Sequence, residues 1–476
     1  MRTTSNIEGW IYAATILASL ALTPNSYAAD AETETDLSPV TVIERTTSSS
    51  DIDDPENSNK HKRLKSVFTR NGLHLGPLTF HFTLDVGNNY VYNPNRNPGA
   101  SQGINFRVVE DLRTTVSFNT TTAYAYKKFN TTLAGGVSYN HYWGLKDPTT
   151  KNLSATTGHA NLGMVYALKG VTFSMYGGFQ RMVPPRLQVL GQRLGVNTVN
   201  TGTSVSFLPG GGALSITADY MFGFTTFDSV STSAINSTNI FDNITHIPSL
   251  RIQWRFLPKT ALYSINRLTI RTFNNTRDLI RADGTPVIGS ATGKNAYLFL
   301  SELGVTGSLT KRIAVTVGAG YNAMIANEAT GTSHGGVARF NLNYVVPKKF
   351  STGIGLSYGM ASVPLFNLMH STGIGVSYSQ ILWKKLSVGT GLGFSYNQYA
   401  AVVPDIFAGK RRDLSYNWTT SVGYSPLKWI SLSINNMLIY LDTNYTLPTG
   451  IGPDPNARRS TGYLANNFMF QIQMTY

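Results

Sequence analysis

The chain has no cysteine, and only 13% of its 476 residues are charged. Without cysteine there is no disulfide framework, no thiolate metal site and no cysteine nucleophile. The charged fraction is about half of the roughly 25% that is usual in soluble proteins. Long apolar runs are missing as well, because no stretch after the N-terminal segment reaches the ~20 residues that a membrane-spanning helix needs. These absences exclude a disulfide-stapled domain and a helical membrane protein.

The N-terminus predicts a secretory signal peptide. Arg2 precedes an apolar run over residues 10–22, and Ser26 and Ala28 place small side chains before a cleavage site that follows Ala28. A membrane anchor is the alternative, but the run is short for one. Residues 29–77 are polar, with acidic residues first and a basic cluster at 60–65. We therefore expect a signal peptide at 1–28, a disordered periplasmic tail at 29–77 and one folded domain at 78–476.

Eight short turn-like phrases divide the remainder of the chain, of which Leu257-Pro258-Lys259 is typical. They recur about every 43 residues, which indicates a repeated supersecondary unit. Roughly 10–14 residues of alternating apolar and polar side chains flank each phrase, as in half-buried strands. Longer segments rich in Asn, Thr and Gly separate these pairs. With an opening strand near 78–92 and a closing strand near 462–476, the count is about eighteen strands.

This pattern predicts an all-β protein, namely a transmembrane antiparallel up-and-down β-barrel of about 18 strands (16–18), with short periplasmic turns and longer extracellular loops. Strands of soluble sandwiches are typically ~5–6 residues long, and these are about twice that length. A closed barrel is also the only sheet that leaves no unpaired edge in lipid. A secreted propeller with one blade per repeat is the alternative.

The last strand resembles the C-terminal insertion signal of bacterial outer-membrane barrels. The residues that carry this resemblance alternate along one face: Phe468, Phe470, Ile472, Met474 and Tyr476. An ordinary amphipathic last strand would show the same alternation. Together with the signal peptide, the ending predicts the outer membrane of a Gram-negative bacterium, with lipid, lipopolysaccharide and the barrel assembly machinery as partners.

Two further resemblances are local. Leu75-Gly76-Pro77-Leu78, a strand, and then residues 87–93 resemble the first hairpin of the type 2 β-barrel porin family, some members of which are linked to exopolysaccharide export. This resemblance implies a porin-like or exporting barrel. Residues 37–43 are similar to the energy-coupling box of TonB-dependent receptors. Those receptors need a large globular plug that the short tail cannot supply, so a chance match is favoured and coupling to a partner stays open.

Channel-lining residues are expected where basic side chains alternate with apolar ones around Pro258. Five arginines are predicted to face the interior: Arg251, Arg255, Arg267, Arg271 and Arg339. An arginine that faced lipid at mid-depth would cost roughly 2–4 kcal/mol, and basic rings favour anions. Alternatively, these arginines pair with acidic loop residues such as Asp278 or Asp283, or contact lipopolysaccharide phosphates near the rim.

Other residues define what the interior can hold. Segments 351–358, 373–379 and 387–397 present mostly Gly and Ser to the inside, which leaves room for a solute, an inserted loop or the acidic tail. The eight histidines show neither metal-ligand nor catalytic spacing, so we expect no enzyme, no metal and no cofactor. Nucleic-acid binding is not expected either, and the oligomeric state stays open.

The sequence predicts a channel for passive passage of hydrophilic, preferentially anionic solutes or an acidic polysaccharide. An exopolysaccharide-export barrel, or a non-conducting surface barrel that acts in adhesion or assembly, is the alternative.

Overall fold

The computed structural model describes most of the barrel and little of its connections. The described residues are 68–69, 72–92, 100–101, 104–105, 110–146, 151, 153–183, 195–228, 242–273, 295–326, 332–361, 369–383, 385–399, 412–444, 446–448, 458–460 and 463–475. The signal peptide, nearly all of the N-terminal tail, and Tyr476 lie outside them. In the described part no helix is long and apolar enough to cross a membrane, and η2 (Pro209–Gly211) is a single 3-10 turn.

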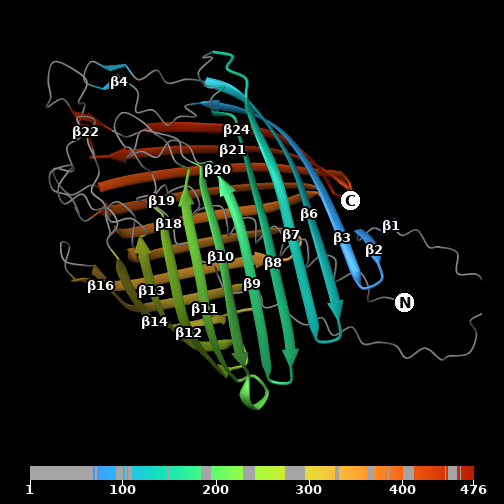
Figure 1. The fold of residues 1–476 in the computed structure, drawn as a ribbon, viewed down its shortest axis with the longest axis vertical. Helices are drawn as coiled ribbons and strands as arrows, with labels where there is room; N and C mark the ends of the chain where they lie inside the picture. The colour runs from blue at the N-terminus through green and yellow to red at the C-terminus, as the bar shows by residue number, and fades with distance from the viewer. Residues whose placement is uncertain are drawn as a thin grey trace, which may run out of the picture.

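One antiparallel sheet of twenty strands forms the body of the molecule (Figure 1). β1 (Phe68–Thr69) and β2 (Gly72–Leu75) only extend one edge, and the other eighteen follow each other around the sheet. These eighteen are β3 (Leu78–Tyr92), β6 (Glu110–Tyr126), β7 (Phe129–Tyr142), β8 (Ala155–Leu168), β9 (Val171–Met182), β10 (Val196–Phe207), β11 (Leu214–Phe227), β12 (Asn243–Leu257), β13 (Thr260–Phe273), β14 (Ala296–Ser308), β15 (Ile313–Ala326), β16 (Thr332–Val346), β17 (Phe350–Ala361), β18 (Met369–Trp383), β19 (Leu386–Tyr399), β20 (Arg412–Leu427), β21 (Ile430–Thr443) and β24 (Tyr463–Thr475).

The sheet closes on itself between its last and first long strands. β24 pairs with β3 antiparallel from Asn466 opposite Tyr92 to Thr475 opposite Thr83. The predicted all-β barrel of about eighteen strands is therefore confirmed. Two short pairs, β4 (Ala100–Ser101) with β5 (Ile104–Asn105) and β22 (Thr446–Pro448) with β23 (Arg458–Ser460), stand apart from the barrel sheet.

The eight predicted turns all join neighbouring strands at one end of the barrel, which we call the turn end. At the first, Tyr126 pairs with Phe129 across a two-residue turn in which Lys127 has a positive φ of 50°. Lys348 has a φ of 61°, and Gly170 has a φ of 79°. Such left-handed residues fit the twist of tight hairpins. The longer connections leave from the opposite end, the loop end.

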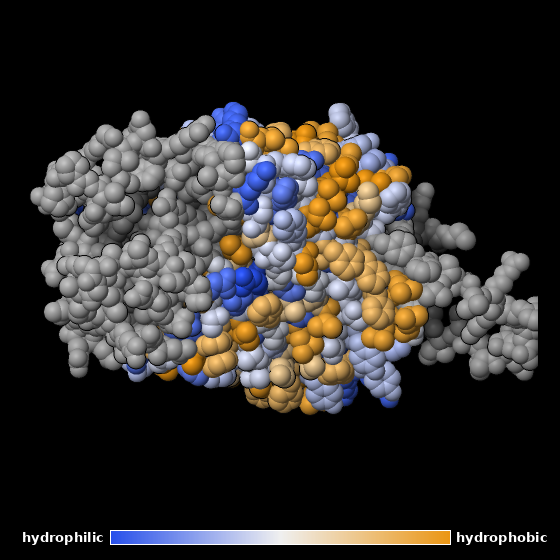
Figure 2. Space-filling view, turned by 45° about the horizontal axis from the view of Figure 1, so that its top comes forward, coloured by the Kyte–Doolittle hydropathy of each residue, from blue (hydrophilic) through white to orange (hydrophobic). Residues whose placement is uncertain are grey.

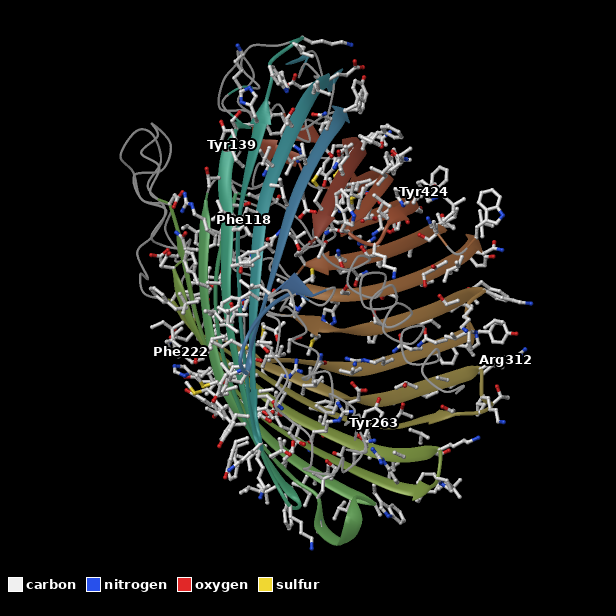
Figure 3. The ribbon with its side chains drawn as sticks, turned by 90° about the vertical axis from the view of Figure 1, so that its right-hand side faces the viewer. Phe118, Tyr139, Phe222, Tyr263, Arg312 and Tyr424 are labelled. Atoms are coloured by element: carbon white, nitrogen blue, oxygen red, sulfur yellow. The ribbon has the colours of Figure 1, made fainter. Side chains whose placement is uncertain are left out.

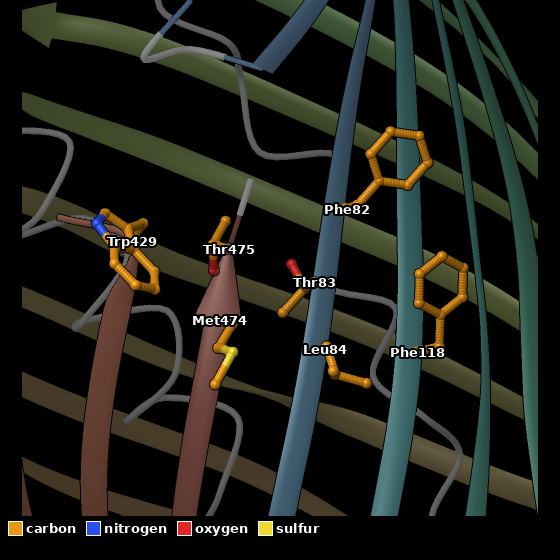
Figure 4. A pocket seen from close by; sticks show the side chains of 7 residues that line it. All are labelled: Phe82, Thr83, Leu84, Phe118, Trp429, Met474 and Thr475. Atoms are coloured by element: carbon orange, nitrogen blue, oxygen red, sulfur yellow. The ribbon is translucent and has the colours of Figure 1, made fainter. Parts of the chain in front are cut away.

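The first described strands also lie at the turn end. β2 pairs with β3 at Leu73 opposite Phe80 and Leu75 opposite Leu78, beyond the point where the pairing of β24 stops. The β1–β2 hairpin thus pairs with the part of β3 that β24 leaves unpaired on the same side. Just outside this seam lies an apolar groove, shown in Figure 4, lined by Phe82, Thr83, Leu84, Phe118, Trp429, Met474 and Thr475.

The outward face of the barrel is apolar. On β12, Leu250, Ile252 and Trp254 are 37–52% exposed. Such side chains recur on strand after strand, and Figure 2 shows them as orange atoms over the part of the wall that it colours. Phe118, Tyr139 and Tyr424, labelled in Figure 3, belong to the same outward set. Apolar surface on this scale is not left against water, because soluble monomers rarely expose patches beyond a few hundred Å².

Aromatic side chains concentrate near both ends of this outward face. Near the turn end, aromatic rings 5.6–5.9 Å apart pair as Trp254 with Phe256, Tyr344 with Phe350 and Phe350 with Tyr378. Near the loop end, rings 5.0–5.4 Å apart pair as His141 with Trp143, Phe222 with His246 and Phe394 with Tyr416. Two such girdles flank the apolar band of membrane barrels, where amphipathic rings meet the headgroups.

Candidate functional site

The inner face of β11–β16 carries a concentration of charged side chains. The strand register sets these residues in adjoining rows. One row runs from Gln253 through Tyr263, Gly304 and Gly318 to Arg339. The next row runs through Thr217, Arg251, Ile265, Glu302 and Gly320. A third holds Asp219, Ser249 and Arg267. We call Arg251, Arg255, Arg267, Arg339, Asp219 and Glu302 the charged wall.

Four of the predicted channel-lining arginines belong to this wall. Arg251 and Arg255 alternate on β12 with the exposed residues Leu250, Ile252 and Trp254, so they share the opposite, inner face. Arg255 is exposed close to the turn end, whereas Arg251 is half-buried further in.

The arginines of β13 and β16 occupy the same face at other depths. Arg267 is half-buried opposite Ser249, and the side chain of Arg339 is 41% exposed. Arg271 is the exception, because it lies nearer the loop end and is only 5% exposed. The loop acids Asp278 and Asp283, the alternative partners, lie outside the described residues.

At the centre of the wall, Glu302 on β14 contacts residues from two other strands, β13 and β16. The Tyr263 hydroxyl donates a hydrogen bond to Glu302 Oε1 at 2.6 Å. Arg339 Nη2 approaches Glu302 Oε2 at 3.9 Å, and the Glu302 side chain is 1% exposed. Arg251 Cζ lies 5.8 Å from the centre of the Tyr263 ring, within cation–π range. One buried carboxylate thus links a tyrosine to a guanidinium whose other side is open to the interior.

Glycines make this arrangement possible. A Cβ atom at Gly304 or Gly318 would collide with the Tyr263 side chain, and a Cβ at Gly318 would also collide with Glu302. The Tyr263 side chain therefore lies along the wall and covers one glycine on β14, Gly304, and one on β15, Gly318. Tyr176 on β9 covers Gly202 on β10 in the same way.

The two acids of the wall were missed by sequence reasoning. Asp219 on β11 accepts a hydrogen bond from Ser249 Oγ at 3.4 Å. Asp219 stands on the polar side of an alternating strand, and this position would have predicted that its side chain faces the interior. Glu302 had no such signal, because residues 296–300 are apolar on both faces. The alternative partners of the arginines were loop acids, which lie outside the described residues, and the structure places two further carboxylates within the wall itself.

Beside the charged wall lies a surface of small side chains on β17–β19. The register aligns Gly355, Gly375 and Gly393 in one inner row and Ser357, Gly373 and Ser395 in the next. Neither row adds charge or bulk to the interior. The interior is thus asymmetric, with guanidiniums on one side and glycine and serine on the neighbouring side.

An apolar collar lines the inner face at the loop end. Its residues share the inner face of their strands and are at most 8% exposed: Val91, Tyr142, Ile247, Phe273, Leu298, Met324, Met369, Tyr399, Ile439, Leu441 and Tyr463. Arg271 lies at the same level, next to Phe273 in the alternation of β13. The collar was not foreseen, since the expected interior was polar throughout.

The charged wall carries more basic than acidic side chains. Guanidiniums are fixed cations with several donors, suited to carboxylate and phosphate groups. Glu302 and Asp219 offset part of this charge, which leaves the wall net basic. Among the described residues, no group of three His, Asp or Glu side chains is placed to hold a metal ion.

Together these features define a class of protein. A closed antiparallel barrel with an apolar outer face, two aromatic girdles, short turns at one end and long connections at the other is a porin-like β-barrel of the outer membrane of Gram-negative bacteria.

Comparisons with known proteins find solved structures of limited similarity and no family. No family model and no curated protein matches the sequence, so the resemblance to the type 2 β-barrel porin family finds no support at family level. Similar solved structures include the outer membrane protein OpdK of Pseudomonas aeruginosa, with 11% identity over 83% of this chain and 99% of that chain and a TM-score of 0.42.

Two others are OpdQ of the same organism (9% identity, 83% and 98% coverage, TM-score 0.41) and the FrpB iron transporter of Neisseria meningitidis (8% identity, 83% and 81% coverage, TM-score 0.43). At such identities and TM-scores the likeness carries no conclusion about this chain.

Proposed function

We propose that this barrel is a channel for passive passage of hydrophilic, preferentially anionic solutes across the outer membrane. The observation that carries the proposal is the charged wall, where four arginines and two acids share the inner surface. An eighteen-stranded barrel is wide enough to enclose an aqueous path. Basic side chains that line such a path raise the local concentration of anions and lower the barrier to their passage.

Conductance measurements test the proposal directly. The protein would be folded in detergent and inserted into a planar bilayer with a KCl gradient, and the reversal potential would be recorded. We expect steady conductance with a preference for chloride, and a fall in the anion-to-cation permeability ratio of about twofold or more in the double variant Arg251→Gln, Arg339→Gln. Lys428→Gln in a turn removes one charge away from the interior and serves as the control.

Other outcomes would overturn the proposal. Silence from folded, inserted protein would favour a non-conducting barrel that acts in adhesion or assembly. Loss of a surface polymer on deletion of the gene, with unchanged uptake of small solutes, would instead favour export of an acidic polysaccharide. Both alternatives accommodate the barrel. A role in adhesion or assembly gives the basic wall no use, whereas an acidic polysaccharide would also meet that wall, so the uptake measurement decides between export and passage of small solutes.

A further inference from the structure

We propose that the acidic N-terminal segment of this chain, residues 30–56, docks inside the barrel against the charged wall, entering from the turn end. The inference goes beyond the proposed channel, because it gives the wall an occupant that belongs to the protein itself. It rests on charge complementarity, on where the described chain begins, and on the small side chains next to the wall.

Charge complementarity is the first argument. Residues 30–56 contain nine Asp and Glu residues and a single basic residue, Arg45. The charged wall has the opposite balance, with four arginines and two acids. Opposite charges inside a barrel are screened less than on an open surface, because the low-dielectric wall confines the field.

The second argument is the position of the first described strands. β1 and β2 lie at the turn end, where β2 pairs with the start of β3. The segment that precedes Phe68 is therefore tethered at the turn-end opening of the barrel. β12 is on the far side of the barrel, because six strands lie between it and β3 along one direction of the sheet.

The tether is long enough to reach. Eighteen strands spaced ~4.8 Å apart and tilted by roughly 40° give a barrel about 36 Å across. Twelve residues separate Glu56 from Phe68, and an extended chain covers about 3.4 Å per residue, which gives about 41 Å. Glu56 can thus just reach Arg251 from the turn end, and the acids further towards the N-terminus reach it with slack.

The third argument is space. The inner rows of Gly and Ser on β17–β19 lie beside the wall and project almost no side-chain volume. An extended segment can therefore lie along this surface with its carboxylates turned towards Arg339 and Arg251. The guanidinium of Arg339 is open to the interior on the side away from Glu302, which leaves donors available to such carboxylates.

Disulfide trapping tests the docking, and the cysteine-free sequence makes the experiment clean. Ser50→Cys places a thiol beside the acids at 51–56, and Gln253→Cys places one on the inner face between Arg251 and Arg255. Ile252→Cys, one residue away on the outward face, is the matched control. Each pair would be oxidised in the folded full-length protein and scored by the mobility shift of the cross-linked chain.

We expect the Ser50→Cys, Gln253→Cys pair to cross-link at least tenfold faster than the pair with Ile252→Cys. The rate should fall severalfold when Asp51, Asp53 and Asp54 are changed to Asn, and also in 1 M NaCl. Equal rates for the two pairs, no disulfide in folded protein, or indifference to charge removal would each overturn the docking.

Conductance separates this inference from the proposed function. With the segment docked, the three Asp→Asn changes should raise single-channel conductance. A barrel that is silent with or without these changes but cross-links as expected would refute the channel and leave the docking intact. A conducting, anion-preferring barrel without the cross-link would do the reverse.

Discussion

Tyr263 on β13 donates a 2.6 Å hydrogen bond to Glu302 on β14, although the two residues do not stand opposite each other in the ladder. Tyr263 faces Gly304, and Glu302 faces Ile265. The Tyr263 side chain therefore passes over Gly304, and its hydroxyl reaches the Glu302 carboxylate in the adjacent row. The bond is buried, so its loss leaves an acceptor without its donor, and such losses cost more than surface ones.

Removing this hydroxyl should destabilise the barrel measurably. Tyr263→Phe keeps the ring over the glycines but deletes the donor, and we expect a loss of about 1.5–3 kcal/mol in the free energy of unfolding. The midpoint of urea unfolding in detergent would measure it. Tyr321→Phe is the control, since that ring packs against His334 on the outer face, and a change within about 0.5 kcal/mol is expected there. Equal effects would refute the role of the bond.

The contact of Tyr176 with Gly202 should appear as energetic coupling. The three atoms nearest to a Cβ at Gly202 would all belong to the Tyr176 side chain. Gly202→Ala should therefore cost about 1–3 kcal/mol in wild-type background and much less beside Tyr176→Ala. Gly375→Ala, where a Cβ has open space, is the control. Additive effects in the double-mutant cycle would show that the cost of the added methyl group does not come from the Tyr176 ring.

Glu302 and Arg339 should shift ion selectivity in opposite directions. Glu302→Gln removes a negative charge beside the Arg339 guanidinium and should raise the anion-to-cation permeability ratio, whereas Arg339→Gln should lower it. The reversal potential in a salt gradient measures both. Glu302→Asp retains the charge and should leave the sign of the preference unchanged. Shifts in the same direction for both Gln variants would mean that geometry rather than charge sets the selectivity.

The ion pair after β11 should contribute stability that is lost in acid. Hydrogen bonds from Arg181 at 2.7 and 3.0 Å lower the pKa of Asp228 below its ordinary value. The native carboxylate binds protons more weakly than the unfolded one, so its contribution is complete above the unfolded pKa and disappears as pH falls through the lower native pKa. The unfolding midpoint would be measured between about pH 2 and 6. Asp228→Asn should reduce its dependence on pH over this range, because the variant has no carboxylate to protonate there.

Asp242, just before β12, should change the stability of the barrel with pH in the direction opposite to Asp228. Burial raises the pKa of Asp242, and a hydrogen bond from the backbone N–H of Phe227 at 2.9 Å only partly offsets this. The native state then holds its proton more tightly, and stability falls as pH rises from the unfolded pKa to the raised native pKa. Asp242→Asn should remove this fall. A variant that behaved like Asp228→Asn would contradict the assignment.

The barrel itself was predictable because two signals agree along most of the chain. Alternation gives strand and face, and turn residues give the boundaries, so the opening strand was expected at 78–92 and lies at Leu78–Tyr92. The inward side of Arg251 followed from its neighbours Leu250 and Ile252. The insertion signal stays a prediction, although Phe468, Phe470 and Met474 are 40–46% exposed on the outward face.

What could not be predicted lies where both faces of a strand are apolar. Tyr297 and Phe299 face outward, but Leu298 joins the inner collar, and only pairing with β13 distinguishes them. The inward position of Glu302 could not be predicted for the same reason. Its contact with Tyr263 depends on glycines contributed by two different strands, and no pattern within one strand reports such a coincidence.

The collar at the loop end has a consequence of its own. Its side chains are at most 8% exposed, so this part of the inner face is packed and dry. A polar group introduced there, for example at Met324, would lose its hydration without gaining a hydrogen-bond partner, and such burial is costly. The two ends of the inner face should therefore differ in their tolerance of polar substitutions, with the loop end the less tolerant.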